Sequence, residues 1–60
     1  MTPREFKKAR KALGLSQQKL GDRIGRTVRQ IIRYEMGDVQ IPIIAIWAMK
    51  AIVSEHEASQ

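Results

Sequence analysis

The sequence predicts an all-α domain of four or five helices, and three observations lead to this prediction. Apolar residues recur at helical spacing, residues that favour a helix start precede them, and glycines follow them. Sixty residues are enough for one small domain. Because the chain has no cysteine, neither disulfide bonds nor a thiolate metal site can stabilise it, and association between copies is the remaining common route.

The first predicted helix begins at Pro3. Thr2 is a good N-cap residue, Pro3 suits the first helical position, and Glu5 can complete a capping box with Thr2. Gly14 ends the helix. The apolar stripe that should face the core consists of Phe6, Ala9 and Leu13.

Two more helix starts follow within a short stretch, at Ser16 and Thr27. Both residues favour the N-cap position, and Gln30 can complete a capping box with Thr27. Gly25 can end the first of these helices and Gly37 the second. Two short helices joined by a glycine-containing turn predict a helix-turn-helix.

This stretch resembles the helix-turn-helix of the phage repressor and Cro family, also called the XRE-like family. The matching residues, at the family's spacing, are Leu15, Ser16, Gln17, Leu20, Ile24, Gly25, Thr27, Ile31, Arg33, Tyr34, Glu35 and Gly37. Gly21 stands where the family usually has Ala, and we expect it to pack closely against the helix that follows. The resemblance covers roughly residues 3–52. It implies a compact lambda-repressor-like fold and sequence-specific binding of double-stranded DNA.

The resemblance also implies two residue roles. Arg10 and Glu35 match a pair that commonly forms a structural ion pair in the family, and Gln17 matches a residue that lies against the DNA backbone. The start of a helix near residue 17 also suits a phosphate, because its first N–H groups are unpaired. The residues that we expect at phosphates are Gln17, Gln18, Arg26, Thr27 and Gln40.

The second helix of the pair, about residues 28–36, carries the predicted base-reading face. If Ile31 and Tyr34 face the core, the residues turned away are Val28, Arg29, Ile32 and Arg33. Two arginines one turn apart can each offer a planar fork to guanine, and apolar side chains can contact thymine methyl groups. The alternative for Ile32 is that it packs under the last helix.

The last predicted helix runs from Pro42 to about Val53 and is apolar on two faces. The faces consist of Ile44, Ala48 and Ile52, and of Ile46, Met49 and Val53. One face should complete the core and the other should meet a second copy, but the pattern does not decide between them. We assign the dimer interface to Ile46, Trp47, Met49 and Val53. The domain then covers residues 1–53, and residues 54–60 form a polar tail.

The charges are divided unevenly along the chain. Residues 1–33 contain ten of the eleven Lys and Arg residues and two acidic residues, a net charge of +8, whereas residues 34–60 have a net charge of −3. A basic half favours a polyanionic partner. The apolar stretch 41–53 is too short to span a bilayer and no signal peptide is evident, so we expect a cytoplasmic protein.

The expected function is that of a homodimeric repressor on a palindromic operator. The resemblance implies a regulator of phage or mobile-element type that represses its own operon. We expect no enzyme, cofactor, metal or small-molecule effector, since the chain offers no catalytic constellation and no sensor domain. One alternative is an antitoxin-like protein whose apolar C-terminal helix binds a partner protein. The other is a protein-interaction module that has lost DNA binding.

Overall fold

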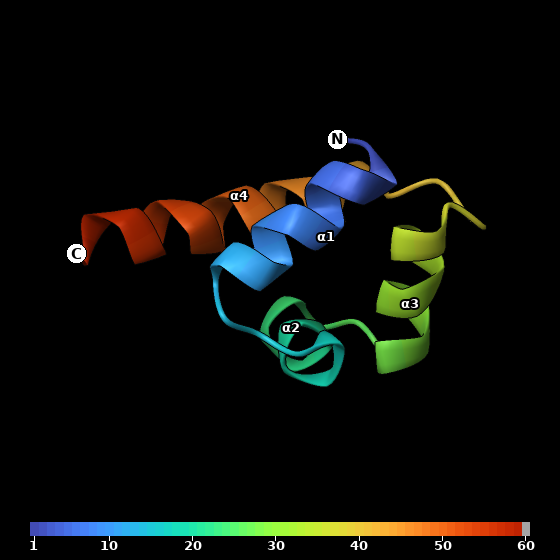
Figure 1. Ribbon diagram of the computed structural model, residues 1–60, viewed down its shortest axis with the longest axis horizontal. Helices are drawn as coiled ribbons and strands as arrows, with labels where there is room; N and C mark the ends of the chain where they lie inside the picture. Colours follow the sequence, from blue (N-terminus) through green and yellow to red (C-terminus); the bar gives the residue numbers. More distant parts are fainter. Residues whose placement is uncertain (60) are drawn as a thin grey trace.

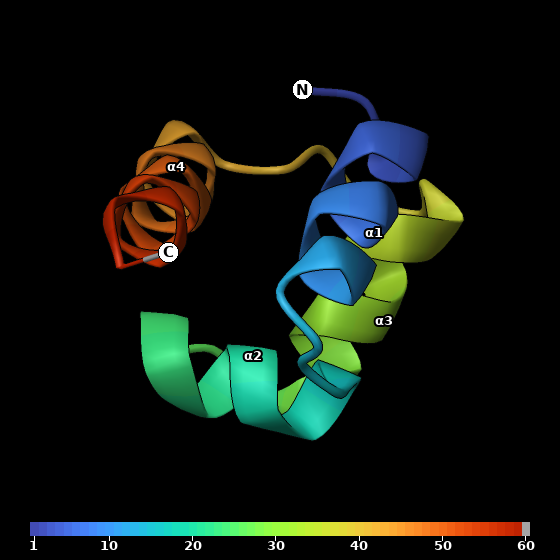
Figure 2. The same cartoon turned by 60° about the vertical axis from the view of Figure 1, so that its left-hand side comes forward.

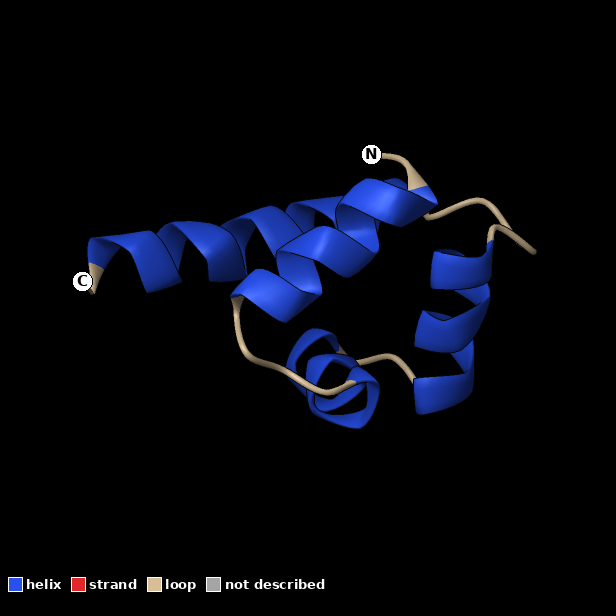
Figure 3. Ribbon diagram, viewed as in Figure 1, coloured by secondary structure: helices blue, strands red, loops and turns tan. Residues whose placement is uncertain are grey.

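The computed structural model describes residues 1–59, which form four helices (Figures 1 and 3). In chain order these are α1 (Pro3–Ala12), α2 (Gln17–Ile24), α3 (Val28–Met36) and α4 (Ile43–Ala58). The part of the chain that the structure describes contains no strand, as the all-α prediction requires. The helix-turn-helix consists of α2 and α3, at the positions that the sequence predicts.

Both predicted capping boxes are formed. The hydroxyl of Thr2 accepts from the backbone N–H of Glu5 at 3.1 Å, and the Glu5 carboxylate accepts from the backbone N–H of Thr2 at 2.8 Å. Thr27 and Gln30 make the same reciprocal pair at the start of α3, at 3.2 and 2.9 Å. Each box satisfies N–H groups that a helix start leaves without an intrahelical acceptor, and so fixes where the helix begins.

The turn between α2 and α3 depends on two glycines. Gly25 ends α2 with φ +74°, a left-handed conformation that glycine adopts without steric cost. Gly21 is buried inside α2, and a Cβ there would lie 2.5 Å from the carbonyl oxygen of Arg26. The predicted close contact of Gly21 therefore exists, but its partner is the turn ahead of α3 and not the body of α3.

Helix α4 is longer than the sequence predicts. It continues through the predicted polar tail to Ala58, so the predicted end of the helix at about Val53 is wrong. Glu and Ala favour helices, and polar side chains on an exposed helical turn remain solvated, so polarity alone did not mark the helix end. Gln60 of the predicted tail lies outside the described residues. No helix within residues 1–59 is long and apolar enough to cross a membrane.

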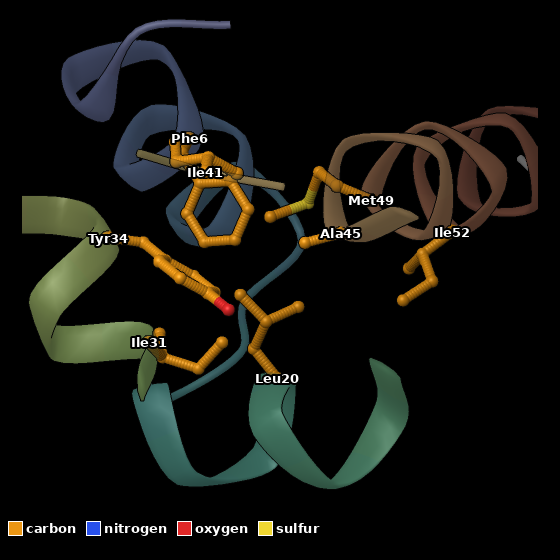
Figure 4. Close-up of a cluster of buried hydrophobic side chains, with 8 residues drawn as sticks. All are labelled: Phe6, Leu20, Ile31, Tyr34, Ile41, Ala45, Met49 and Ile52. Carbon is orange, nitrogen blue, oxygen red and sulfur yellow. The ribbon is translucent and has the colours of Figure 1, made fainter. Parts of the chain in front are cut away.

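The core lies between the four helices, and residues from α3 and α4 enter it from opposite sides (Figures 2 and 4). Phe6 from α1 and Tyr34 from α3 meet edge to face, with ring centroids 5.9 Å apart and an interplanar angle of 83°. Such aromatic pairs contribute beyond the area they bury. The buried apolar residues are Phe6, Leu20, Ile31, Tyr34, Ile41, Ala45, Met49 and Ile52.

Candidate nucleic-acid interface

The outer face of α3 carries two free arginines. Arg29 and Arg33 are exposed, and neither side chain makes a hydrogen bond or ion pair within residues 1–59. Ile31 and Tyr34 point into the core on the other side of the helix, as the sequence predicts (Figure 4). The guanidinium groups, four residues apart, therefore extend from a helix that the core holds in place, and their donors are available to an external acceptor.

Val28 and Ile32 are the apolar members of the predicted base-reading face. Both are half-buried, and neither is among the side chains that pack against the buried cluster of residues 1–59. The alternative position for Ile32, under the last helix, is therefore wrong. The reason is geometric: Ile31 occupies the inward position of α3, and Ile32 is turned away from it by about 100°. Part of each apolar side chain remains available for contact.

The start of α2 is closed by one side-chain cap. The hydroxyl of Ser16 accepts from the backbone N–H of Lys19 at 3.1 Å. The earlier N–H groups, those of Gln17 and Gln18, have no intrahelical acceptor, as at any helix start. The side chain of Gln18 donates to Asp22 at 3.1 Å on the same helix. Partial positive charge thus remains at this end of α2, which favours an anion.

A buried ion pair joins α1 to the end of α3. Arg10 Nε donates to Glu35 Oε2 at 2.6 Å and Arg10 Nη2 donates to Glu35 Oε1 at 3.2 Å, so the fork is bidentate. The exposed fractions of the two side chains are 10% and 4%. Arg10 Nη1 also donates to the carbonyl oxygen of Leu15, at 2.9 Å. The ion pair implied by the resemblance is present, and it also fastens the loop between α1 and α2.

Gln17 is a third member of this pair's network, which the sequence did not predict. Its Nε2 donates to Glu35 Oε1 at 3.1 Å. Residues 17 and 35 are eighteen apart in sequence, so no local pattern could have revealed this bond. The expected phosphate contact of Gln17 remains a prediction, now for a side chain that already has one fixed partner.

The other predicted phosphate residues lie in the connecting segments. Arg26 is half-buried in the α2–α3 turn, where its backbone N–H donates to the carbonyl oxygen of Gly21 at 2.8 Å. Thr27 is exposed, but its backbone N–H and hydroxyl are engaged in the capping box. Gln40 is exposed in the loop before α4. These three residues come from different segments, and their roles at DNA remain predictions.

The structure corrects the predicted dimer interface on α4. Met49 is fully buried in the core of the single chain, so its assignment to an interface is wrong. Ile46 and Val53 are half-buried and pack against the same core, which leaves them little free surface. Of the four assigned residues, Trp47 alone, 67% exposed, points outward as predicted. Ala45, Met49 and Ile52 are spaced as one helical stripe, and that stripe faces the core.

The exposed apolar surface of α4 lies on its other side. Trp47 is accompanied there by Ile43 and Ile44, each 64% exposed. We call these three residues the outer face of α4. A surface shared by three large apolar side chains on one helix differs from the scattered exposed apolar residues that are normal for monomers.

The far end of α4 borders a hollow in the surface. This hollow has a volume of about 320 Å³ and lies between the end of α1, α2 and the last turns of α4. Arg23 and Glu55 form an ion pair at 3.7 Å beside it, with both side chains more than half exposed. An exposed pair of this kind contributes little to stability. No residue of α3 lines the hollow, so it is separate from the predicted base-reading face.

Comparison with known proteins agrees with this geometry. Residues 6–49, from the first core residue of α1 to the last fully buried residue of α4, match the helix-turn-helix family. Searches of curated proteins and of solved structures found no match. The match covers most of the chain and includes both helices of the motif and their packing partners. The chain belongs to the XRE-like helix-turn-helix family of DNA-binding transcription regulators.

Proposed function

We propose that this protein is a homodimeric repressor that recognises a palindromic operator through α3. The observation that carries the proposal is the pair of exposed arginines, Arg29 and Arg33, on the outward side of a helix whose inner side is locked in the core. Arginine forks are the commonest specific contact to guanine in the major groove. The half-buried side chains of Val28 and Ile32, beside the arginines on the same helix, suit thymine methyl groups.

The charge distribution supports the same proposal. Ten of the eleven basic residues precede Tyr34, and they lie on α1, on α2, on α3 and in the turn between α2 and α3. Such a surface attracts the DNA backbone over a Debye length and makes binding strongly dependent on salt. The unpaired N–H groups at the start of α2 and the side chains of Arg26 and Gln40 would meet phosphates. These contacts set the position of α3, whereas the arginines set the sequence.

A dimer follows from the size of the site. One recognition helix contacts only a few base pairs, which is too little to select one operator in a genome. A two-fold dimer doubles the site and places its recognition helices about 34 Å apart, one turn of DNA. Repression follows most simply from an operator that overlaps a promoter, and the phage or mobile-element setting follows from the family resemblance.

We place the dimer contact on the outer face of α4. Ile43, Ile44 and Trp47 offer apolar surface, and Lys50 is the only charged residue between Ile43 and Val53. A nearly neutral surface can meet its own copy without repulsion, whereas the basic side of the domain cannot. The outer face of α4 would also suit a second protein, as an antitoxin-like role requires.

The test has two parts. Selection of bound sites from a random DNA pool should yield a palindrome whose half-sites lie one helical turn apart. Sedimentation equilibrium of the protein at micromolar concentration should give a dimer, with Trp47→Glu monomeric and Trp47→Phe still dimeric. Selected sites without two-fold symmetry, together with a monomer on and off DNA, would contradict the proposal. Co-purification of a second protein that is lost in Trp47→Glu would favour the antitoxin-like role.

A further inference from the structure

The side chain of Gln17 is fastened to an acceptor that is itself immobile. Gln17 Nε2 donates to Glu35 Oε1 at 3.1 Å. That carboxylate is 4% exposed and accepts two further hydrogen bonds from Arg10, at 2.6 and 3.2 Å. Arg10 in turn donates to the carbonyl oxygen of Leu15 at 2.9 Å. The position of the Gln17 amide is therefore defined by residues of α1, α3 and the loop between α1 and α2.

Only one of the two amide donors of Gln17 is used. A primary amide nitrogen carries two N–H groups that diverge by about 120°. When one points at the buried carboxylate, the other points away from it, and Gln17 is half-buried at the first position of α2. Within residues 1–59 the side chain makes no other hydrogen bond. A donor remains free at the end of the helix where the backbone N–H groups are also unpaired.

The charge of Glu35 does not oppose an anion at this place. A lone carboxylate near the surface would repel a phosphate, but the guanidinium of Arg10 neutralises it at bidentate distance. The carboxylate still accepts a stronger hydrogen bond from Gln17 than a neutral oxygen would. Arg10 and Glu35 can therefore orient the amide without adding a net charge.

We propose that Glu35 is a positioning residue for DNA binding: it orients the Gln17 amide so that the free N–H meets a phosphate oxygen of the backbone. The inference rests on the proposed DNA-binding function and adds to it a residue that does not touch DNA. A glutamine side chain that is free in solution loses rotamer freedom when it binds. Because Glu35 fixes it beforehand, binding is tighter by about two- to tenfold.

A matched pair of variants separates this role from fold stability. Arg10→Met/Glu35→Gln keeps an acceptor for Gln17 at position 35, and Arg10→Met/Glu35→Met removes it at similar size. Neither variant leaves a buried charge unpaired, so both should fold, as circular dichroism will show. Affinity for a short double-stranded DNA of mixed sequence is measured over a salt series. The variant with Glu35→Met should bind about two- to tenfold more weakly than the variant with Glu35→Gln.

Adding Gln17→Met to both members of the pair decides the mechanism. If Glu35 acts through Gln17, the difference between the two variants should disappear in this background. A difference that persists without Gln17, or equal affinities with Gln17 present, would overturn the inference. If the wild-type protein binds no duplex at all, the proposed function itself fails. If the wild type binds but the two double variants have equal affinities, only the role of Glu35 fails.

A second measurement on the wild type does not depend on the folding of variants. In NMR spectra of the free protein, the two amide protons of Gln17 should be well separated, and the one bonded to Glu35 should be protected from exchange. Addition of the same DNA should shift mainly the other proton. Two averaged, equally exchanging amide protons in the free protein would overturn the inference.

Discussion

The helix-turn-helix and α4 satisfy their ends and faces in different ways. In α2 and α3 each start has a side-chain cap, each end has a left-handed glycine, and the buried residues lie on one side of the helix. Helix α4 starts at Pro42 without a side-chain hydrogen bond, ends at Ser59 without a glycine, and has large apolar residues on both sides. The first region is specified mainly by its own sequence, and the second by what packs against it.

This difference underlies the proposed division of roles, with DNA on α3 and a second copy of the chain on α4. The one-sided burial of α3 leaves Arg29 and Arg33 exposed and free for DNA. The two-sided apolar character of α4 leaves surface that water covers poorly. Substitutions in the two regions should therefore differ in what they change, from the largest expected effect to the smallest.

The largest expected effect comes from the ion pair that joins α1 to the helix-turn-helix. Glu35→Gln leaves the buried guanidinium of Arg10 without its counter-charge, which should cost about 3–5 kcal/mol of unfolding free energy. That is a large part of the stability of a small domain, so urea unfolding followed by circular dichroism should show a large fall in the midpoint. Arg10→Met/Glu35→Met, which removes both charges, should lose much less. An unchanged midpoint for Glu35→Gln would show that the pair contributes nothing to the fold.

Truncation of a side chain should destabilise the fold strongly on the inner side of α4 and hardly at all on its outer side. Met49→Ala opens a cavity in the core and should cost about 2–5 kcal/mol of unfolding free energy. Trp47→Ala removes an exposed side chain, and at a protein concentration low enough to keep the chain monomeric it should change that energy by no more than about 0.5 kcal/mol. Urea midpoints of the two variants measure the contrast. The reverse order would mean that the outer and inner sides of α4 have been exchanged.

The outward side of α3 should govern specificity. Arg29→Ala and Arg33→Ala should each cost about 1–3 kcal/mol of binding free energy on the selected operator and relax the preference at one base pair. Lys50→Ala is the matched control, an exposed cation on α4 whose loss should alter affinity only slightly. Binding is measured by fluorescence anisotropy on the operator and on a scrambled duplex. Equal losses on both duplexes would reassign the arginines to the DNA backbone.

The smallest effect concerns the cap of α1 and depends on pH. Hydrogen bonds from the backbone N–H and the hydroxyl of Thr2 lower the pKa of Glu5 below its usual value of 4.5. A lowered pKa means that the carboxylate stabilises the folded state above about pH 4.5, and that this stability is lost as pH falls through the folded-state pKa. Glu5→Gln should therefore flatten the acid side of the profile of unfolding free energy slightly. A wild-type profile identical to that of Glu5→Gln would show that the box is not charge-dependent.

The sequence predicts the helix-turn-helix better than it predicts α4. The starts of α1, α2 and α3 agree with the predictions because caps are short-range chemistry, in which residues three apart decide the outcome. The inward side of α3 was also predictable, since placing Ile31 and Tyr34 inward turns Arg29 and Arg33 to the opposite side of the helix.

The inward side of α4 could not be predicted, because both candidate sides are apolar and only contact with Phe6, Leu20 and Tyr34 selects Met49 over Ile44. The end of α4 was missed because a polar sequence is equally compatible with a solvated helix and with a tail. At the candidate site, the bond between Gln17 and Glu35 joins residues that are eighteen apart in sequence. Nothing in the local pattern marks a bond of that kind, whereas the outward arginines follow from the wheel alone.

The exposed position of Trp47 also makes the protein its own optical reporter. Trp47 is the only tryptophan, and it lies on the outer face of α4 and not on α3. Its fluorescence in the free monomer should resemble that of an indole in water, and it should shift to shorter wavelength when another molecule covers α4. A label on the DNA would follow occupancy of α3 in the same cuvette. Two spectral channels would thus record, without modification of the protein, whether association precedes or follows the arrival at DNA.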